Sequence, residues 1–199
     1  MNKNILICGV GGQGTVLSSR ILASAYMSEG HTVHSAETIG MAQRGGSVTS
    51  HVRVGDEVFS PLIPEGCAEV ILGFEPGEVA GNLRYLSYGG CVILNSHPIP
   101  PLTVSLKGES YDGTEVLAFL KSQGIRHGVV SSDELVSRFG SVKFFNILIL
   151  GVASGMGVLG VGADSIREQI DKLVKEKFVA INREVFNTGY EIGLKNATE

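Results

Sequence analysis

The chain has 199 residues, of which 43% are hydrophobic, 18% are charged and 27 are glycine. This composition supplies a sizeable core, and it excludes both an intrinsically disordered chain and a mini-protein that depends on disulfides. The formal net charge of −4, without a basic run, excludes a general nucleic-acid binder, because phosphate contacts need a basic surface. No linker, repeat or low-complexity tract is present, so residues 1–199 are expected to form a single domain.

The N-terminal segment is typical of a strand, a helix and a second strand. Ile5–Cys8 is a short apolar run next to a glycine, as expected for a parallel strand that is buried on both faces. Thr15–Glu29 has apolar residues at helical spacing, and Gly30 is placed to cap that helix. Thr32–Ser35 is the next predicted strand, and it would complete a βαβ unit.

A change of pattern begins at Ser47, where apolar and polar residues alternate as in a half-buried strand. Gly55-Asp56 is expected to turn this strand into an antiparallel hairpin, whose return strand runs through Val58 and Phe59.

Two further buried strands are predicted at Val70–Phe74 and Cys91–Leu94. The helix between them is expected to begin at Pro76 and to run to about Tyr88, where Gly89-Gly90 would end it.

The C-terminal half continues the alternation. Asp112 and Glu115 have the spacing of a capping box. The elements predicted in this half are a helix to Gln123, a strand at Val129-Val130, a short helix over Ser132–Phe139 and an amphipathic segment from Asp164 to about Gly193.

No charged residue occurs between Phe144 and Ala163, a length that would cross a bilayer. The glycines of this segment instead favour a buried helix that ends near Gly155–Gly162. Gly151 and Gly155 would allow a close approach to the core or to a partner subunit. No membrane association is expected.

The alternation of strands and helices predicts an α/β fold. We expect a doubly wound, Rossmann-like, mostly parallel sheet with one antiparallel hairpin and a C-terminal helical segment.

The three cysteines, Cys8, Cys67 and Cys91, are widely spaced and lie in apolar surroundings. They are expected to be reduced core residues. Together with the absence of a signal peptide this predicts a cytoplasmic location. Three cysteines cannot hold a four-cysteine iron–sulfur cluster, and no metal site is expected.

The first candidate site is the glycine loop Gly9-Val10-Gly11-Gly12-Gln13-Gly14, which follows a strand and opens a helix. Gly9 would permit a tight turn, Gly11 would let a ligand approach the backbone, and Gly14 would let helix and strand pack closely. Glu37 stands where a ribose hydroxyl would be received. The loop is compatible with a dinucleotide, with another anion, or with a plain structural turn, and the Gln13 amide with a ligand contact or an internal hydrogen bond.

A second candidate loop lies between Ala36 and Ser47. It brings together Gln43, Arg44, Gly45 and Gly46, and it must lie close to the glycine loop. The Arg44 guanidinium suits a carboxylate or phosphate, and pairing with the Glu37 carboxylate is the alternative.

Together the two loops resemble the gamma-type domain of the 2-oxoacid:ferredoxin oxidoreductases, and within that family its indolepyruvate-oxidising branch. The sequences that carry the resemblance are Gly-Val-Gly-Gly-Gln-Gly and Ala-Glu-Thr-Ile-Gly-Met-Ala-Gln-Arg-Gly-Gly-Ser. The likeness continues through Gly73–Pro76, Asn146, Leu150-Gly151, Asn182 and Tyr190-Glu191, and so covers nearly the whole chain.

The resemblance implies a subunit of an enzyme that oxidatively decarboxylates aryl pyruvates to acyl-CoA and reduces ferredoxin. In that family the chemistry uses thiamine diphosphate with magnesium, iron–sulfur clusters and coenzyme A as co-substrate. This chain lacks a cluster-binding cysteine set and a thiamine motif, so a larger partner subunit is expected to carry them.

The expected contacts of this chain are the two loops, at Gly9, Gly11, Gly12, Gln13, Gly14, Glu37, Gln43, Arg44, Gly45 and Gly46. No catalytic acid or base is nominated. Two alternatives are a stand-alone NAD(P) oxidoreductase that uses the glycine loop, and a non-catalytic assembly module; a homodimer is an alternative for the isolated chain.

Overall fold

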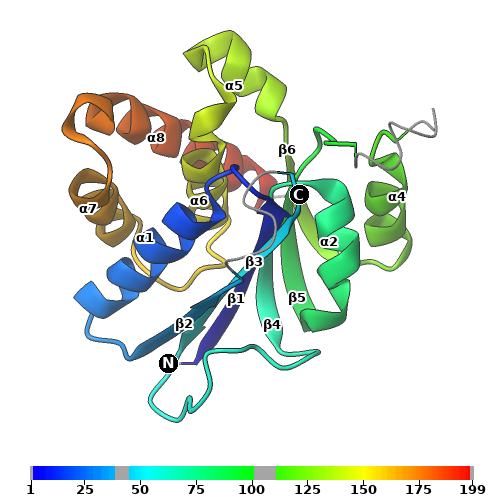
Figure 1. Ribbon diagram of the computed structural model, residues 1–199, viewed down its shortest axis with the longest axis horizontal. Helices are drawn as coiled ribbons and strands as arrows, with labels where there is room; N and C mark the ends of the chain where they lie inside the picture. The colour runs from blue at the N-terminus through cyan, green and yellow to red at the C-terminus, as the bar shows by residue number, and fades with distance from the viewer. Residues whose placement is uncertain (1, 39–44, 101–110, 198–199) are drawn as a thin grey trace.

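The computed structural model describes residues 2–38, 45–100 and 111–197. These residues form a six-stranded sheet in the order β2-β3-β1-β4-β5-β6 (Figure 1). Its strands are β1 (Lys3–Val10), β2 (Val33–Glu37), β3 (Ser47–Val54), β4 (Ala68–Gly73), β5 (Leu86–Asn95) and β6 (Arg126–Val130). β1, β4, β5 and β6 pair in parallel, whereas β3 is antiparallel to both of its neighbours.

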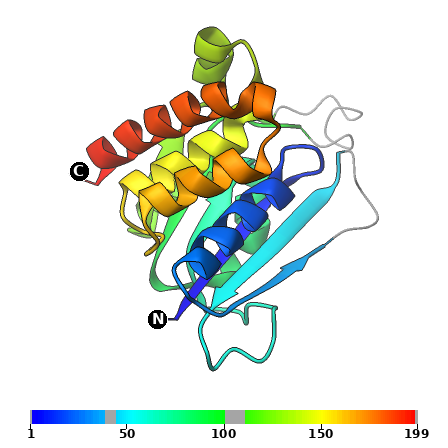
Figure 2. The ribbon, with the colours of Figure 1, turned by 90° about the vertical axis from the view of Figure 1, so that its left-hand side faces the viewer.

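Helices cover both faces of the sheet. They are α1 (Thr15–Ser28), α2 (Pro76–Asn82), α4 (Thr114–Ser122), α5 (Ser132–Phe139), α6 (Phe145–Gly155), α7 (Ala163–Leu173) and α8 (Val179–Asn196), with 3-10 turns at Leu83–Tyr85, Val142–Phe144 and Glu176–Phe178. α1, α6, α7 and α8 lie on one side (Figure 2), and α2 and α4 on the other (Figure 1). The expected α/β, mostly parallel, doubly wound fold is thereby confirmed.

The chain leaves β1 for one face of the sheet and β4 for the opposite face. This change of direction opens a crevice beyond the carboxyl ends of the two strands, where open α/β sheets bind their ligands. The glycine loop follows β1 and therefore lies at this crevice (Figure 1).

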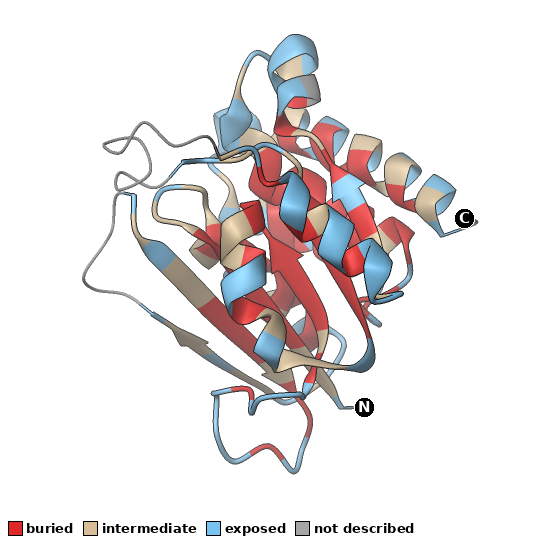
Figure 3. Ribbon diagram, turned by 90° about the vertical axis from the view of Figure 1, so that its right-hand side faces the viewer, coloured by how far each residue is buried: buried red, intermediate tan, exposed pale blue. Residues whose placement is uncertain are grey.

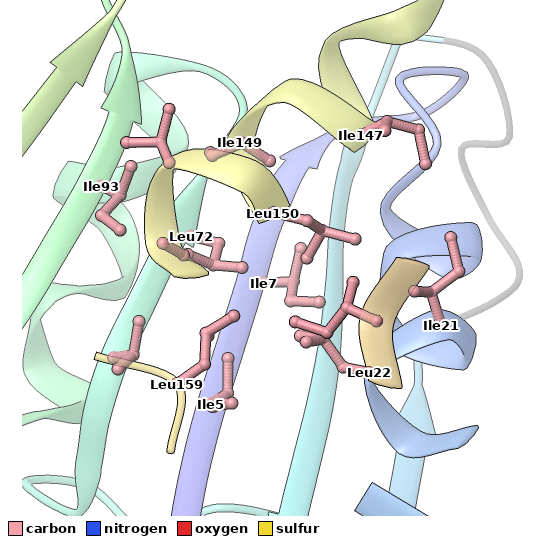
Figure 4. Close-up of a cluster of buried hydrophobic side chains, with 14 of the residues drawn as sticks. Ile5, Ile7, Ile21, Leu22, Leu72, Ile93, Ile147, Ile149, Leu150 and Leu159 are labelled. Carbon is pink, nitrogen blue, oxygen red and sulfur yellow. The ribbon is translucent and has the colours of Figure 1, made fainter. Parts of the chain in front are cut away.

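Alternate residues of β1 enter two separate cores, which explains why its sequence is apolar on both faces. Ile5 and Ile7 pack toward α1 and α6, while Leu6 and Cys8 pack toward α2 and α4. Figure 4 shows the first core and Figure 3 the buried central strands. Helices cover both cores, so β1 is buried on both faces. The strand predicted at Ile5–Cys8 is therefore confirmed.

The first strand, helix and second strand do not form an adjacent βαβ pair. β3 lies between β1 and β2 and pairs antiparallel with both, for example Ile5 with Val52 and Ser35 with Val52. β3 therefore takes the position beside β1 that a βαβ unit would give to β2. The predicted hairpin is not formed. Val58 and Phe59, which were expected to be its return strand, lie in the loop between β3 and β4.

The helix expected from Pro76 to Tyr88 was predicted too long. α2 ends at Asn82, a 3-10 turn follows, and β5 already begins at Leu86. Gly89-Gly90 therefore lies inside β5 and does not end a helix. An added Cβ at Gly90 would lie 3.1 Å from the carbonyl oxygen of Ala68, so this glycine permits a close strand contact at the bulge in the β4–β5 pairing.

The predicted capping box before α4 is also wrong. Gly113 is the N-cap, with φ of 71°, and Thr114 is the first helical residue. Asp112 Oδ1 accepts hydrogen bonds from Thr114 N–H and Oγ–H at 3.0 and 2.7 Å. The Asp side chain thus closes a turn ahead of the helix, and Glu115 lies in the first turn without reaching back.

The uncharged segment forms the buried helix α6, as predicted. Gly151 and Gly155 of α6 contact Gly189 and Gly193 of α8, which runs parallel beside it (Figure 2). The close approach expected from the two glycines is therefore made within the chain, to α8. Among the described residues, no helix is both long and apolar enough to cross a membrane.

Candidate functional site

The glycine loop makes its turn at Gly12 and Gly14 rather than at Gly9. Their φ angles are 101° and 89°, a conformation that favours glycine. Gly9 is part of β1, where an added Cβ would lie 2.7 Å from Phe74 Cβ. At Gly14 an added Cβ would lie 3.2 Å from Asn146 of α6. The roles assigned to Gly9 and Gly14 are corrected accordingly: Gly9 allows close packing, and Gly14 passes α6 rather than a strand.

The Gln13 amide is used inside the fold at both ends. Its Oε1 accepts a hydrogen bond from Val10 N–H at 2.6 Å, and its Nε2 donates to the Phe74 carbonyl at 3.0 Å. Two roles were considered for the Gln13 amide, a ligand contact and an internal hydrogen bond, and the structure shows the internal hydrogen bond. The side chain therefore ties the end of β1 to the end of β4 and holds the crevice in shape.

The end of the second loop lies against the glycine loop, as expected. Gly11 N–H donates to the Gly46 carbonyl at 2.9 Å, and Gly45 has φ of 82°. Gln43 and Arg44 lie outside the described residues, as does any pairing of Arg44 with Glu37.

Glu37 lies at the end of β2, and its Oε1 accepts a hydrogen bond from Ser19 Oγ at 2.8 Å. Because β3 separates β2 from β1, Glu37 is two strands away from β1, or about 10 Å at the usual strand spacing. A dinucleotide-binding acidic residue ends the strand beside β1. This topology therefore disfavours the NAD(P) alternative.

Ser47, which follows the second loop, is tied to α2. Its Oγ donates to Glu78 Oε2 at 2.5 Å. Burial raises the pKa of the Glu78 carboxyl, the Ser47 hydrogen bond opposes this rise, and the nearby Glu75 charge adds to it. The start of β3 and α2 are thus connected through a carboxyl group whose pKa is raised.

We expect Glu78→Gln to stabilise the fold slightly at neutral and alkaline pH. A pKa that is raised on folding contributes stability at low pH, and this contribution is lost as the pH rises through the folded-state pKa. Glutamine keeps an acceptor for Ser47 but removes the charge. The gain should stay below about 1 kcal/mol, because the side chain is only partly shielded from solvent. It should disappear near pH 4, where glutamate is largely protonated.

Urea unfolding at a series of pH values measures this difference. The matched control is Glu57→Gln, which removes a carboxylate from an exposed position, and its free energy of unfolding is measured over the same pH series. A Glu78→Gln variant that loses stability at pH 8 would contradict the assignment.

Glu75 was not singled out as a functional residue, yet it is 3% exposed at the carboxyl end of β4. Its Oε2 caps α2 by accepting from Glu78 N–H at 2.9 Å. Its Oε1 accepts from Tyr111 Oη–H at 2.7 Å and from Ile99 N–H at 3.3 Å. Burial and this hydrogen bond raise the pKa of Tyr111. One buried carboxylate therefore anchors three segments beside the crevice.

Asn95 also joins several segments, at the end of β5. Its side chain donates to the Phe74 carbonyl at 3.2 Å and to Ser132 Oγ at 3.3 Å, and it accepts from Ser132 N–H and His97 N–H at 3.1 Å. Both residues mark the carboxyl end of a buried strand: Glu75 comes two residues after β4, and Asn95 is the last residue of β5. That position, a polar residue immediately after an apolar run, is the sequence signal that would have identified them.

A hollow of about 200 Å³ lies at this edge of the sheet. His97 at its rim pairs with Asp133, with 2.9 Å between Nδ1 and Oδ1. The lining of the hollow is mostly apolar and includes Ile99, Val142 and Phe145. The other lining residues are Gly12, Gln13, Asn95, His97, Ser132 and Lys143.

The cysteines differ from the expectation in one case. Cys8 and Cys91 are buried in β1 and β5, and burial raises the pKa of both thiols, but Cys67 is exposed. The three do not converge. Over the described parts of the chain, no group of three or more His, Cys, Asp or Glu side chains is arranged to hold a metal ion.

Comparison with known proteins places this geometry among the oxidoreductases. The family model described as pyruvate ferredoxin/flavodoxin oxidoreductase matches residues 4–192. The chain is 39% identical over 191 residues to indolepyruvate oxidoreductase subunit IorB of Archaeoglobus fulgidus, and the match covers 96% of this chain and 94% of that protein.

Solved structures share the fold. The gamma subunit of keto/oxoacid ferredoxin oxidoreductase from Geobacter sulfurreducens has a TM-score of 0.69 at 21% identity, over 97% of this chain and 99% of that one. The 2-oxoglutarate:ferredoxin oxidoreductase from Magnetococcus marinus has a TM-score of 0.70 at 19% identity. The match covers 98% of this chain but only 31% of that one, so in the longer protein the same fold is one part among others.

Proposed function

Because the chain belongs to the pyruvate ferredoxin/flavodoxin oxidoreductase family, we propose that it is the small subunit of a 2-oxoacid:ferredoxin oxidoreductase that acts on indolepyruvate or another aryl pyruvate. The observation that carries this proposal is the 39% identity to an indolepyruvate oxidoreductase subunit along nearly the full length of both chains. The complex releases carbon dioxide from the 2-oxoacid, transfers the acyl group to the thiol of coenzyme A, and passes the electrons to ferredoxin.

The described residues of this chain do not fit thiamine diphosphate with its metal, or an iron–sulfur cluster. Cys8 and Cys91 are buried in the sheet, Cys67 is apart from them, and the acidic side chains do not gather into a metal site. We assign those cofactors to a larger partner subunit, and the complex to the cytoplasm. This chain is then inactive alone.

The test is reconstitution. The chain should copurify with a larger, cluster-containing subunit, and ferredoxin reduction with indolepyruvate and coenzyme A should require both. Turnover by the isolated chain, or failure of the two to associate at micromolar concentration, would overturn the proposal.

Within the complex, we assign the two loops at the carboxyl edge to the contact with the larger subunit. The support is the Gly11–Gly46 hydrogen bond, which joins the two loops, and the hollow beside them, whose lining includes the Lys143 ammonium group. Arg44 is proposed to bind a carboxylate or phosphate of the substrates there, since a guanidinium can form two parallel hydrogen bonds with such groups.

Arg44→Ala is expected to lower kcat/KM of the reconstituted complex by about tenfold or more, as expected when a hydrogen bond to a charged group is lost. Arg44→Lys should recover only part of it, because lysine cannot make the paired contact. Arg20→Ala, on the exposed side of α1, is the control. Steady-state assays in which each substrate is varied in turn measure kcat/KM for these variants. If the Arg44→Ala complex turned over as fast as the unaltered complex, the binding role of Arg44 would be refuted.

A further inference from the structure

The sheet has an open edge at β6, its last strand. β6 pairs with β5 over Arg126–Val130 and, among the described residues, with no strand on its other side (Figure 1). A groove of about 570 Å³ lies against β6, between the end of α4 and the ends of α6 and α8, and its lining includes Met156 and Asn196. The outer edge of β6 is therefore accessible to another strand.

The hydrogen bonds between β5 and β6 decide which backbone groups of β6 remain free. Ser96 N–H donates to the Val130 carbonyl at 2.8 Å, so the N–H and C=O of Val130 face β5. In a strand the N–H and C=O of one residue point to the same side, and that side alternates along the chain. Val130 and every second residue before it thus bond to β5, whereas the N–H and C=O of His127 and Val129 point outward. These two residues leave four backbone groups free at the edge.

The free groups lack the devices that usually keep a second strand away. Native sheets protect an open edge with lysine, proline or a β-bulge. β6 contains no lysine or proline, and its register with β5 is regular. Its Arg126 comes before the free groups and donates to the Met156 carbonyl at 3.4 Å. Beside the free groups the apolar side chain of Val129 is 38% exposed. This edge is suited to pairing.

The free groups are symmetric about Gly128, and this symmetry favours a second copy of the chain as the partner. If a second copy lies antiparallel at the edge, with a two-fold axis at Gly128, then His127 of each copy is opposite Val129 of the other. Residues opposite each other in this way exchange both of their N–H···O=C hydrogen bonds. All four free groups of each copy are then paired. At the axis the two strands approach most closely, and there glycine has no side chain to interfere.

The charges along the edge also suit a reversed second copy. Lys121 and Arg126 line the groove near the amino end of β6, and no Asp or Glu is among its lining residues. Asp133, which pairs with His97 but has a side chain that is 69% exposed, follows the carboxyl end of β6. Antiparallel pairing places the basic end of each copy beside the acidic end of the other, so the charges attract.

We propose that two copies of this chain associate edge to edge through β6, which joins their sheets into one continuous sheet. The contact uses the same residues on both sides, as a two-fold interface must. It goes beyond the proposed function and does not depend on it. Because the two copies run in opposite directions, their carboxyl edges face opposite ways. The glycine loop of each copy therefore stays free for the larger subunit.

Sedimentation velocity of the purified chain over a concentration series measures this association. Val129→Pro removes the outward N–H from both copies, and so two of the four hydrogen bonds across the axis, without removing a bond to β5. We expect it to raise the Kd of the dimer by about 30-fold or more, the effect of two lost hydrogen bonds. The matched control Val129→Ala keeps the N–H and should weaken association far less. A thermal melt of each variant reports whether the fold is intact.

Cysteine cross-linking tests the register without a proline. In a Cys67→Ser background, His127→Cys/Val129→Cys should form a disulfide-linked dimer on oxidation, because opposite positions lie about 5.5 Å apart between Cα atoms. His127→Cys alone should not be linked, since the two copies of position 127 are diagonal neighbours, about 7–8 Å apart and beyond the reach of a disulfide.

The outcomes decide this inference separately from the proposed function. A dimer that is weakened by Val129→Pro and linked only in the double cysteine variant supports it. A chain that stays monomeric up to millimolar concentration refutes it. A dimer that gives no cross-link in the double variant also refutes it, because the copies then meet through another surface. Failure of the larger subunit to bind overturns the proposed function and leaves the β6 contact standing.

Discussion

Gly155→Val is expected to cost about 3 kcal/mol or more of folding free energy, a large share of the 5–15 kcal/mol that holds a typical domain together. A Cβ at Gly155 would overlap the carbonyl oxygen of Tyr190 and lie 2.9 Å from the Leu194 nitrogen. These are backbone atoms of α8, so no side chain can rotate away. The variant must push α8 off α6 and open the core behind it.

The matched control is Gly81→Val in α2, an exposed helical glycine whose added Cβ would meet no atom within 4 Å. Its free energy of unfolding should change by about 0.5 kcal/mol or less, because valine and glycine differ little in helix propensity. Chemical denaturation of the two variants gives the comparison. A Gly155→Val protein as stable as Gly81→Val would contradict the direct backbone contact between α6 and α8.

Glu75→Ala is expected to lower the free energy of unfolding by about 2–4 kcal/mol. It removes the cap of α2, a loss of about 1 kcal/mol, and it leaves the partly buried Tyr111 hydroxyl and the Ile99 N–H without their acceptor. Glu75→Gln should also destabilise, because its amide NH₂ would face one of these donors.

Thermal and urea unfolding of both Glu75 variants test this. Glu65→Ala, which breaks only the exposed ion pair with Arg84, should stay within about 0.5 kcal/mol of the parent. If Glu75→Gln were as stable as the parent, the three-donor arrangement would be wrong, since only a carboxylate has an acceptor for every donor.

Short apolar runs between glycines predicted the buried strands β1, β4 and β5 well, because each of these strands is covered on both faces. The same reasoning was wrong at Val58 and Phe59. Val58 is buried and Phe59 exposed, as in a strand, but the backbone of this segment is held by Arg53 and His51 instead of by a neighbouring strand. The alternation of apolar and polar residues indicates which side chains are buried, but it does not indicate which groups the backbone hydrogen-bonds to.

The candidate site was also predictable from the sequence only in part. The glycine loop and its closeness to the second loop were predictable, since a strand-to-helix turn needs glycine and both loops end at the same edge. The internal use of the Gln13 amide was not, because its partner Phe74 is 61 residues away in the chain. Glu75 and Asn95 also join segments that are distant in sequence, over separations of 21 to 37 residues.

The sequence by itself determined the class of fold, the buried strands and the family, because these depend on local hydrophobic periodicity and on motifs with fixed spacing. Only the tertiary structure decided that β3 lies between β1 and β2, that the α6 glycines face glycines of α8, and that Phe59 is exposed on an anchored loop. The physical reason is that strand order, helix contacts and exposure depend on residues far apart in the chain. No local pattern specifies which of several apolar faces or free backbone edges will meet.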